Sequence, residues 1–160
     1  MSSGERRQAL ERALRGDFAE WEGLPDGTEA ADFAAISNEA SEPGQARLGT
    51  LPATFRNYDG GALRVWFDQQ DRPFLVQAIQ PPLARSSRDV LASLGPPEAR
   101  LERSQSRIPG AVQWVWASRG VSAHVRGEDK IEALALFPPT NVEYYETWLG
   151  GHERPTYRPR

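Results

Sequence analysis

The chain has 160 residues, 39% of them hydrophobic and 26% charged, and its formal net charge is −3. A chain of this length folds as one domain or as two small fused repeats, and its acidic balance argues against a nucleic-acid-binding protein. It contains no cysteine, which excludes disulfides, thiolate metal sites and cysteine nucleophiles. No apolar run reaches the length of about 18 residues that a membrane span needs. Without cysteines and without the apolar stretch of a secretory signal, we expect a cytoplasmic protein.

Two helices are predicted before the first strand. Residues 5–23 carry apolar side chains at helical spacing and charged side chains on the opposite side, which is typical of an amphipathic helix. A second, shorter helix is predicted over residues 28–36, with Thr28 as its N-cap. A run of turn-forming residues follows, so the segment before residue 46 is expected to be a loop.

From residue 46 the apolar pattern changes to a period of two, which predicts strands. The strands of the first group are expected over residues 47–51, 53–58, 63–68 and 74–80. A helix capped by Ser86 and closed by Gly95 follows that group. The strands of the second group are expected over residues 99–104, 111–117, 121–126 and 131–137. A last helix over residues 141–149, with a capping box of Thr140 and Glu143, precedes an extended tail over residues 151–160.

The two groups of strands share one order of features, which indicates an internal repeat. Their last strands, FLVQAIQPP (74–82) and IEALALFPP (131–139), have equal length and the same Pro-Pro ending. We therefore predict one domain over residues 1–150, built from two pseudo-repeats at about 28–82 and 86–139. The expected fold is α+β, in which two tandem helix–β-meander modules form one antiparallel sheet with helices packed on one face. The other face of such a sheet stays open.

The capped helix SSRDVLASLG (86–95) and the meander after it, repeated once in the chain, resemble the β-lactamase-inhibitor protein architecture. A single unit also looks like the small outer-membrane assembly lipoproteins that share this helix-and-sheet fold. The resemblance covers residues 28–150 in the order of elements. It implies a sheet face that binds another protein.

Catalytic and metal-binding motifs are absent from the sequence. The two histidines are His124 and His152, and no phosphate-binding loop, nucleophile elbow or metalloprotease motif occurs. We therefore predict neither a metal nor a cofactor. His152 lies in the tail, and His124 alternates with apolar residues, which predicts a solvent-facing position on its strand.

The leading hypothesis is a small soluble binding module that recognises a protein or peptide through its open sheet face. Alternation places Trp66 with charged neighbours, while Leu63, Val65 and Phe67 form the apolar stripe of the strand. Two readings therefore stay open for Trp66, an exposed anchor of the binding face or a tryptophan that covers the end of the core. Aromatic and arginine side chains together are typical of interaction hot spots. The predicted binding residues are Arg56, Tyr58, Arg64, Trp66, Asp68, His124 and Arg126.

The alternative hypothesis is a cofactor-free enzyme of the cyclase or isomerase type that acts on a small molecule between sheet and helices. Its cavity would be lined by Trp114, Trp116, Tyr144 and Tyr145. His124, Asp68 or an arginine would transfer the proton. The last helix displays Tyr144, Tyr145 and Trp148 together, which also allows a homo-oligomer contact.

Overall fold

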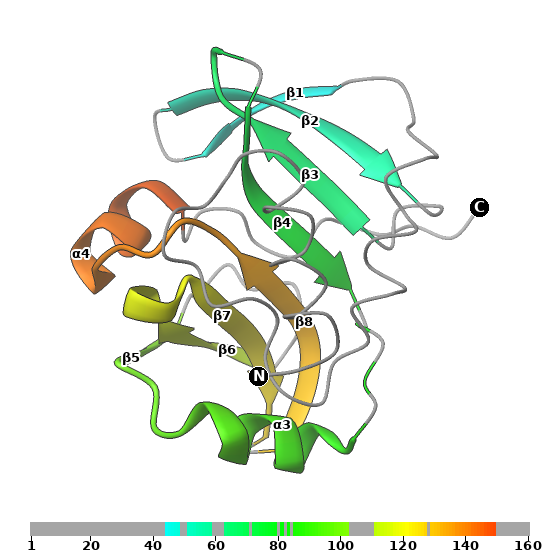
Figure 1. The fold of residues 1–160 in the computed structure, drawn as a ribbon, viewed down its shortest axis with the longest axis vertical. Coiled ribbons are helices and arrows are strands. Elements are labelled where there is room, and N and C mark those ends of the chain that lie inside the picture. The colour runs from blue at the N-terminus through cyan, green and yellow to red at the C-terminus, as the bar shows by residue number, and fades with distance from the viewer. Residues whose placement is uncertain are drawn as a thin grey trace, which may run out of the picture.

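The computed structural model describes residues 44–48, 51–58, 63–70, 72–79, 81, 83, 85–102, 111–127 and 129–149. The helices expected over residues 5–23 and 28–36, and the tail over residues 151–160, lie outside the described residues. The described residues fold as the α+β arrangement that the alternating pattern predicts (Figure 1).

The described strands form one antiparallel sheet of eight in the order β1-β2-β3-β4-β8-β7-β6-β5. The first four run consecutively as a meander, and the second four do the same. The two meanders meet where β4 lies beside β8, with Val76 opposite Leu136 and Ile79 opposite Ala133. The strands are β1 (Gly44–Leu48), β2 (Leu51–Tyr58), β3 (Leu63–Phe67), β4 (Pro73–Ile79), β5 (Ala99–Leu101), β6 (Ala111–Trp116), β7 (Val121–Arg126) and β8 (Lys130–Leu136).

The predicted helix after the first meander is confirmed as α3 (Ser87–Leu94). Ser86 is its N-cap, and its hydroxyl accepts a hydrogen bond from the backbone N–H of Asp89. Gly95 ends the helix at φ 78°, a left-handed conformation that costs glycine little. Short 3-10 helix η3 (Ala117–Arg119) follows β6.

The last predicted helix forms two short pieces, α4 (Val142–Tyr144) and the π-helix η4 (Tyr145–Leu149). Its N-cap is Asn141, whose side chain accepts a 2.7 Å hydrogen bond from the backbone N–H of Tyr144. The prediction of Thr140 as the cap is therefore one residue too early. No helix in the described part of the chain is long and apolar enough to cross a membrane.

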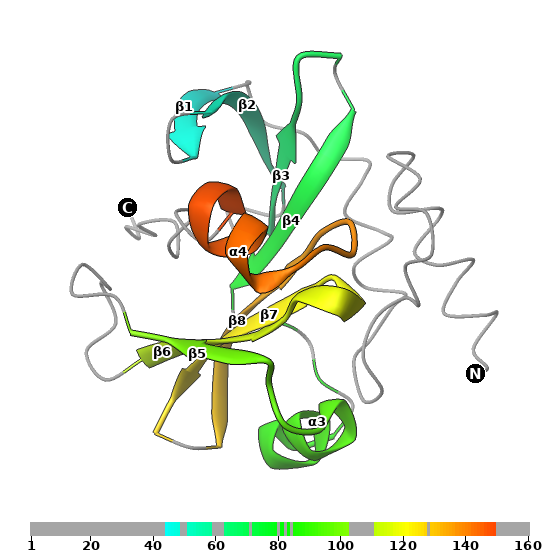
Figure 2. The same cartoon turned by 90° about the vertical axis from the view of Figure 1, so that its left-hand side faces the viewer.

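Helix α3 and the segment α4–η4 lie on opposite faces of the sheet (Figure 2). On one face, here called the α3 face, Val90, Leu91 and Leu94 pack against a core that includes Trp114 and Trp116. On the other face, here called the η4 face, apolar side chains of η4 pack against the sheet. The strand residues that they contact alternate along the chain with residues of the core of the α3 face. The core of the η4 face contains Ala53, Trp66, Leu75, Val115, Ala117, Ala135, Phe137, Tyr145 and Leu149.

The expectation that helices cover one face only is therefore wrong. The physical reason lies in β6 and β8, which carry buried apolar side chains on both sides. Val115 and Ala135 belong to the core of the η4 face, whereas their neighbours Trp114, Trp116, Leu134 and Leu136 belong to the core of the α3 face. A strand that is apolar on both sides needs a cover on each.

Candidate functional site

Polar side chains are buried on only one face of the sheet within the described residues. Four of them alternate along their strands with residues that pack on the α3 face, and so project from the η4 face, and a bulge brings Glu132 to the same face. A buried polar group costs free energy unless it is hydrogen-bonded, so such groups gathered on one face mark it as the candidate site. They are Gln77, Gln113, Ser122, His124 and Glu132.

The hydroxyl of Tyr145 connects two of these side chains. It donates a 2.7 Å hydrogen bond to Oε1 of Gln113 and lies 2.8 Å from Oγ of Ser122. Because the phenol proton points to Gln113, the Ser122 hydroxyl is the donor to the Tyr145 oxygen. This network ties η4 to β6 and β7 across the η4 face.

A β-bulge brings Glu132 to the same face as His124. His124 is opposite Ala133 and Val125 is opposite Ile131, so Glu132 is the extra residue on β8. Its Oε1 lies 3.0 Å from Nε of Arg126, and the side chains of the two residues are 6% and 50% exposed. Glu132 thus follows directly on the register partner of His124 and pairs with the half-exposed Arg126.

At the other end of the η4 face, β2, β3 and β4 contribute an arginine–aromatic cluster. The guanidinium carbon of Arg64 lies 3.9 Å from the ring centroid of Phe55 and 5.8 Å from that of Trp66. The indole N–H of Trp66 donates a 2.6 Å hydrogen bond to Oε1 of Gln77. Arg64 is half-buried, and this burial lowers the pKa of its guanidinium below its ordinary value.

Two of the predicted binding residues are buried, contrary to expectation. Trp66 is 3% exposed and His124 is 6% exposed. The side chain of Trp66 packs in the core of the η4 face because Phe55 stacks on it from β2, with ring centroids 5.1 Å apart. Alternation predicts which face each residue occupies, but it does not reveal that this face has its own apolar cover.

Three of the remaining predicted residues lie at separate positions. Arg126 pairs with Glu132 at the rim, as described above, and Arg64 lies in the cluster with Phe55 and Trp66. Asp68 has a turn role, since its Oδ1 accepts hydrogen bonds from the backbone N–H groups of Gln70 and Arg72.

Arg56 lies on the other face. It is exposed and stands opposite Val65, a residue of the core of the α3 face. The register that pairs Phe55 with Trp66 makes Phe55, and not Arg56, the β2 neighbour of the cluster. The side chain of Tyr58 lies outside the described residues. The single surface expected from Arg56 to Arg126 is therefore divided between two faces.

The residues of the enzyme hypothesis are divided in the same way. Trp114 and Trp116 belong to the core of the α3 face, Tyr145 is fully buried on the η4 face, and Tyr144 is 47% exposed. Sequence reasoning missed Gln77, Gln113, Ser122 and Glu132. Three of them had a visible signal, because Gln77, Gln113 and Glu132 interrupt otherwise apolar runs of their strands. Within the described ranges, no group of three or more His, Asp or Glu side chains is arranged to hold a metal ion.

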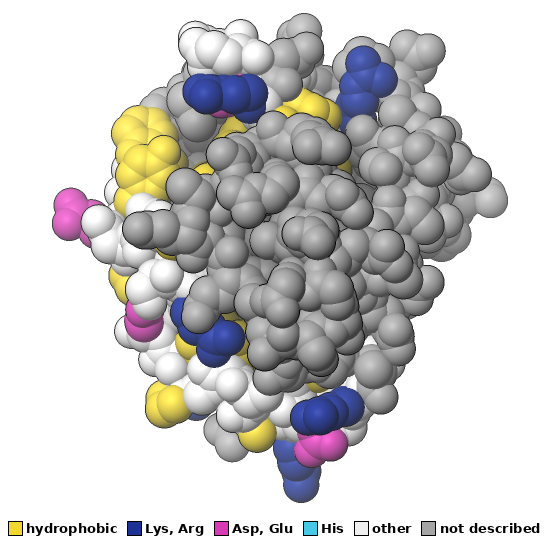
Figure 3. Space-filling view, viewed as in Figure 1, with side chains coloured by type: hydrophobic (Ala, Val, Ile, Leu, Met, Phe, Trp, Pro, Cys, Tyr) yellow, Lys and Arg dark blue, Asp and Glu magenta, His cyan; other side chains and the backbone are white. Residues whose placement is uncertain are grey.

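On the side of the molecule shown in Figure 3, the basic side chains of the described residues are spread out and do not gather in one patch. No family model and no curated protein match the chain. Among solved structures, the chain is similar to the crystal structure of a DUF4309 family protein (YjgB) from Bacillus subtilis, at 9% identity and a TM-score of 0.39. That match covers 86% of this chain and 97% of the other. A likeness at this level identifies neither a family nor a function.

Proposed function

We propose that the chain is a small binding module that recognises a protein or peptide through the arginine–aromatic cluster of the η4 face. The observation that carries this proposal is the guanidinium of Arg64, held 3.9 Å from the ring of Phe55 in a partly desolvated position. A stacked guanidinium has a fixed plane and directs its N–H groups sideways, a geometry suited to carboxylates and backbone carbonyls. Trp66 is buried beside Arg64, with its ring centroid 5.8 Å from the guanidinium carbon, and is not itself the anchor.

The burial of Arg64 costs free energy of solvation, and a neutral side chain on the aromatic rings would avoid that cost. Arginine and aromatic side chains are also enriched at the centres of protein interfaces. We propose a cytoplasmic protein, on the basis of the missing cysteines.

We also propose that the two meanders are tandem modules of the kind that the β-lactamase-inhibitor protein resemblance implies. The mirrored strand order supports this proposal, as does the pairing of β4 with β8, each seven residues long. The helices do not follow the repeat, because α3 and η4 lie on opposite faces. The proposed repeat is therefore restricted to the strands.

A homo-oligomer contact is proposed through Tyr144 and Trp148, which are exposed and half-buried on the last helical segment. Tyr145 is not part of this contact, because its side chain is fully buried.

A second candidate function is a cofactor-free enzyme of the cyclase or isomerase type. The observation in its favour is that His124 on β7 and Glu132 on β8 are both buried, where a bulge interrupts the pairing of these strands. Neighbouring titratable groups in a buried position are typical of acid–base catalysis, although ion pairs of structural origin share this feature. In this reading His124 transfers the proton, and Glu132 with Arg126 orients it.

Capture from a lysate of the source organism, followed by native mass spectrometry, tests the proposed function. The bait is the tagged full chain, compared with the Arg64→Met variant. A stoichiometric protein partner that the variant loses supports the binding module. A bare chain that carries a small-molecule adduct, unchanged in Arg64→Met and lost in His124→Gln, contradicts it and supports the enzyme.

A further inference from the structure

Strand β5 forms one edge of the sheet, and β6 is its only neighbour among the described strands. Figure 1 shows it at the margin of the molecule. Within the described residues, the backbone N–H and C=O groups that point away from β6 have no strand beside them. Such an edge is a template for the addition of another strand, so the side chains of β5 decide what pairs with it.

Two charged side chains lie two residues apart on this edge. Arg100 is in β5 and Glu102 follows the strand directly, and both are exposed. Arg100 stands opposite Trp114, a residue of the core of the α3 face, and continuation of the strand places Glu102 on that face too. The guanidinium carbon of Arg100 lies 4.1 Å from the ring centroid of Trp114. This stack fixes the plane of the guanidinium and leaves its N–H groups at the edge of that plane.

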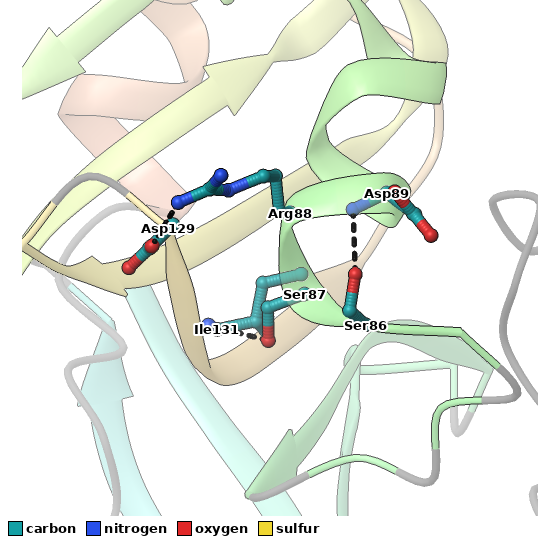
Figure 4. A network of polar contacts seen from close by, with 6 residues as sticks. All are labelled: Ser86, Ser87, Arg88, Asp89, Asp129 and Ile131. Atoms are coloured by element: carbon teal, nitrogen blue, oxygen red, sulfur yellow. Dashed lines mark hydrogen bonds and ion pairs between the residues drawn. The ribbon is translucent and has the colours of Figure 1, made fainter.

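Neither charge is neutralised in the part of the chain that the structure describes. The ion pairs there involve other residues, and the stack on Trp114 is the interaction that Arg100 makes. Arg88 of α3 shows the contrast, because it is also exposed and yet pairs with Asp129 at 3.0 Å (Figure 4). The edge of the sheet thus presents a cation and an anion side by side, each ready for an opposite charge.

We propose that β5 pairs with β5 of a second copy of this chain, antiparallel and with Leu101 opposite Leu101. This register places Arg100 of each copy opposite Glu102 of the other, so two ion pairs form on the α3 face. Leu101 is half-buried on the η4 face and covers its counterpart across the two-fold axis. Even-numbered residues face even-numbered ones, so backbone groups directed at the open edge in one copy meet those of the other.

Charge favours this register over the neighbouring ones. Antiparallel pairing centred on Arg100 would place two arginines opposite each other and Glu98 opposite Glu102, and like charges in these positions are destabilising. A register that pairs Arg100 with Glu98 uses a carboxylate that is already engaged, since its two oxygens accept hydrogen bonds from the backbone N–H and the hydroxyl of Ser118. Glu102 is the acidic residue of this edge that is available to a second copy.

The contact is small, so the dimer should be weak. A strand of three residues and its flanks bury less than the roughly 1,200 Å² of a stable interface, and we expect a dissociation constant of about 10 to 1,000 µM. This contact is distinct from the one proposed through Tyr144 and Trp148, which lie on the last helical segment. It does not involve Arg64 or a protein partner, so it stands or falls independently of the proposed function.

Sedimentation equilibrium of the full chain tests the contact by exchange of charges. Arg100→Glu and Glu102→Arg should each raise the dissociation constant of the dimer at least about tenfold, because two attractive pairs become repulsive. An equimolar mixture of these two variants should dimerise about as well as wild type, since one copy carries two carboxylates and the other two guanidinium groups. The matched control is Arg56→Glu, an exposed arginine on the same face of β2, which should change the dissociation constant by less than about twofold.

Three results of this experiment would overturn the proposal. One is a chain that stays monomeric up to about 2 mM, above the range expected of a weak dimer. Another is a mixture of Arg100→Glu and Glu102→Arg that dimerises no better than either variant alone. The third is a dimer that Tyr144→Ala abolishes and Arg100→Glu leaves intact.

The position of the two-fold axis gives a second test, because the chain contains no cysteine. In the proposed register two Leu101→Cys side chains lie opposite each other, within the reach of a disulfide, whereas two Ala99→Cys side chains are displaced along the strands beyond that reach. Both positions are half-buried on the η4 face, so Ala99→Cys is the matched control. Mild oxidation near the dissociation constant should cross-link Leu101→Cys at least about fivefold faster than Ala99→Cys. Equal rates for the two variants would overturn the register.

Discussion

The indole nitrogen of Trp66 donates a hydrogen bond of 2.6 Å to the side-chain oxygen of Gln77 on the neighbouring strand. Both residues are 97% buried, so Gln77 supplies the acceptor that the indole N–H needs in the core. Gln77 thus allows a tryptophan to be buried beside Arg64 in the arginine–aromatic cluster.

Replacement of Trp66 by phenylalanine should destabilise the fold, because it leaves Oε1 of Gln77 buried without the indole donor. Loss of a hydrogen-bond donor to a buried polar atom costs about 1–3 kcal/mol, and we expect a loss of about 2 kcal/mol in the free energy of unfolding. Urea unfolding of Trp66→Phe measures it. The double variant Trp66→Phe/Gln77→Leu should lose less than the sum of the two single variants by about 1 kcal/mol. Additive losses would show that the hydrogen bond contributes no coupling energy between Trp66 and Gln77.

The ion pair of Arg126 and Glu132 should respond asymmetrically to substitution. Arg126→Met leaves a carboxylate that is 6% exposed without its cation, whereas Glu132→Gln leaves a half-exposed arginine that water can solvate. Breaking a fully buried pair costs 3–5 kcal/mol, and with Arg126 half-exposed we expect about 2 kcal/mol for Arg126→Met. Glu132→Gln should cost less than half of that in the same denaturant titration at neutral pH. A larger loss for Glu132→Gln would contradict this account of the bulge.

The attachments at the start of α3 should differ in strength. Ser86→Ala removes the N-cap bond to the N–H of Asp89 and should cost about 1 kcal/mol. Arg88→Ala removes an ion pair between side chains that are 78% and 53% exposed, and solvent screening reduces its effect to about 0.5 kcal/mol or less. Thermal unfolding of both variants shows which of them loses more stability. Equal losses would mean that the Arg88–Asp129 ion pair stabilises the fold more than its solvent exposure predicts.

Removal of the Arg64 charge should leave the fold nearly as stable as before. The cation–π contact with Phe55 and the cost of desolvation oppose each other, so Arg64→Met should change the free energy of unfolding by less than about 1 kcal/mol. Because burial lowers the pKa of Arg64, the folded state holds its proton less tightly than the unfolded state. The destabilisation that comes from burying the charged guanidinium is fully present at neutral pH. It declines only as pH rises through the lowered pKa, in the alkaline range. The difference between wild type and Arg64→Met should therefore be flat from about pH 5 to 9.

Strands were predictable from the sequence because their period of two is a local property. The alternation of Val65 and Phe67 with Arg64 and Trp66 places each side chain on the face that it occupies in the structure. The turn residues also sufficed to locate α3 and its cap at Ser86.

The cover over each face was not predictable in this way, because it depends on contacts between distant segments. Trp66 is buried by packing that involves Phe55, Tyr145 and their neighbours, none of which its own strand reveals. The bulge at Glu132 is equally hidden, since it is a property of the pairing between β7 and β8. A polar residue inside an apolar strand, as at Gln77, is the sequence feature that would have indicated a second buried face.

The most direct test of the central claim compares two arginines that stack on aromatic rings on opposite faces. Arg64 lies 3.9 Å from Phe55 on the η4 face, and Arg100 lies 4.1 Å from Trp114 on the α3 face. The measurement is the dissociation constant of the captured partner for wild type, Arg64→Met and Arg100→Met. We predict an increase of at least about tenfold for Arg64→Met, as expected of an interface hot spot, and a change of less than about twofold for Arg100→Met. An equal effect of both substitutions, or a larger one for Arg100→Met, would contradict the assignment of binding to the η4 face.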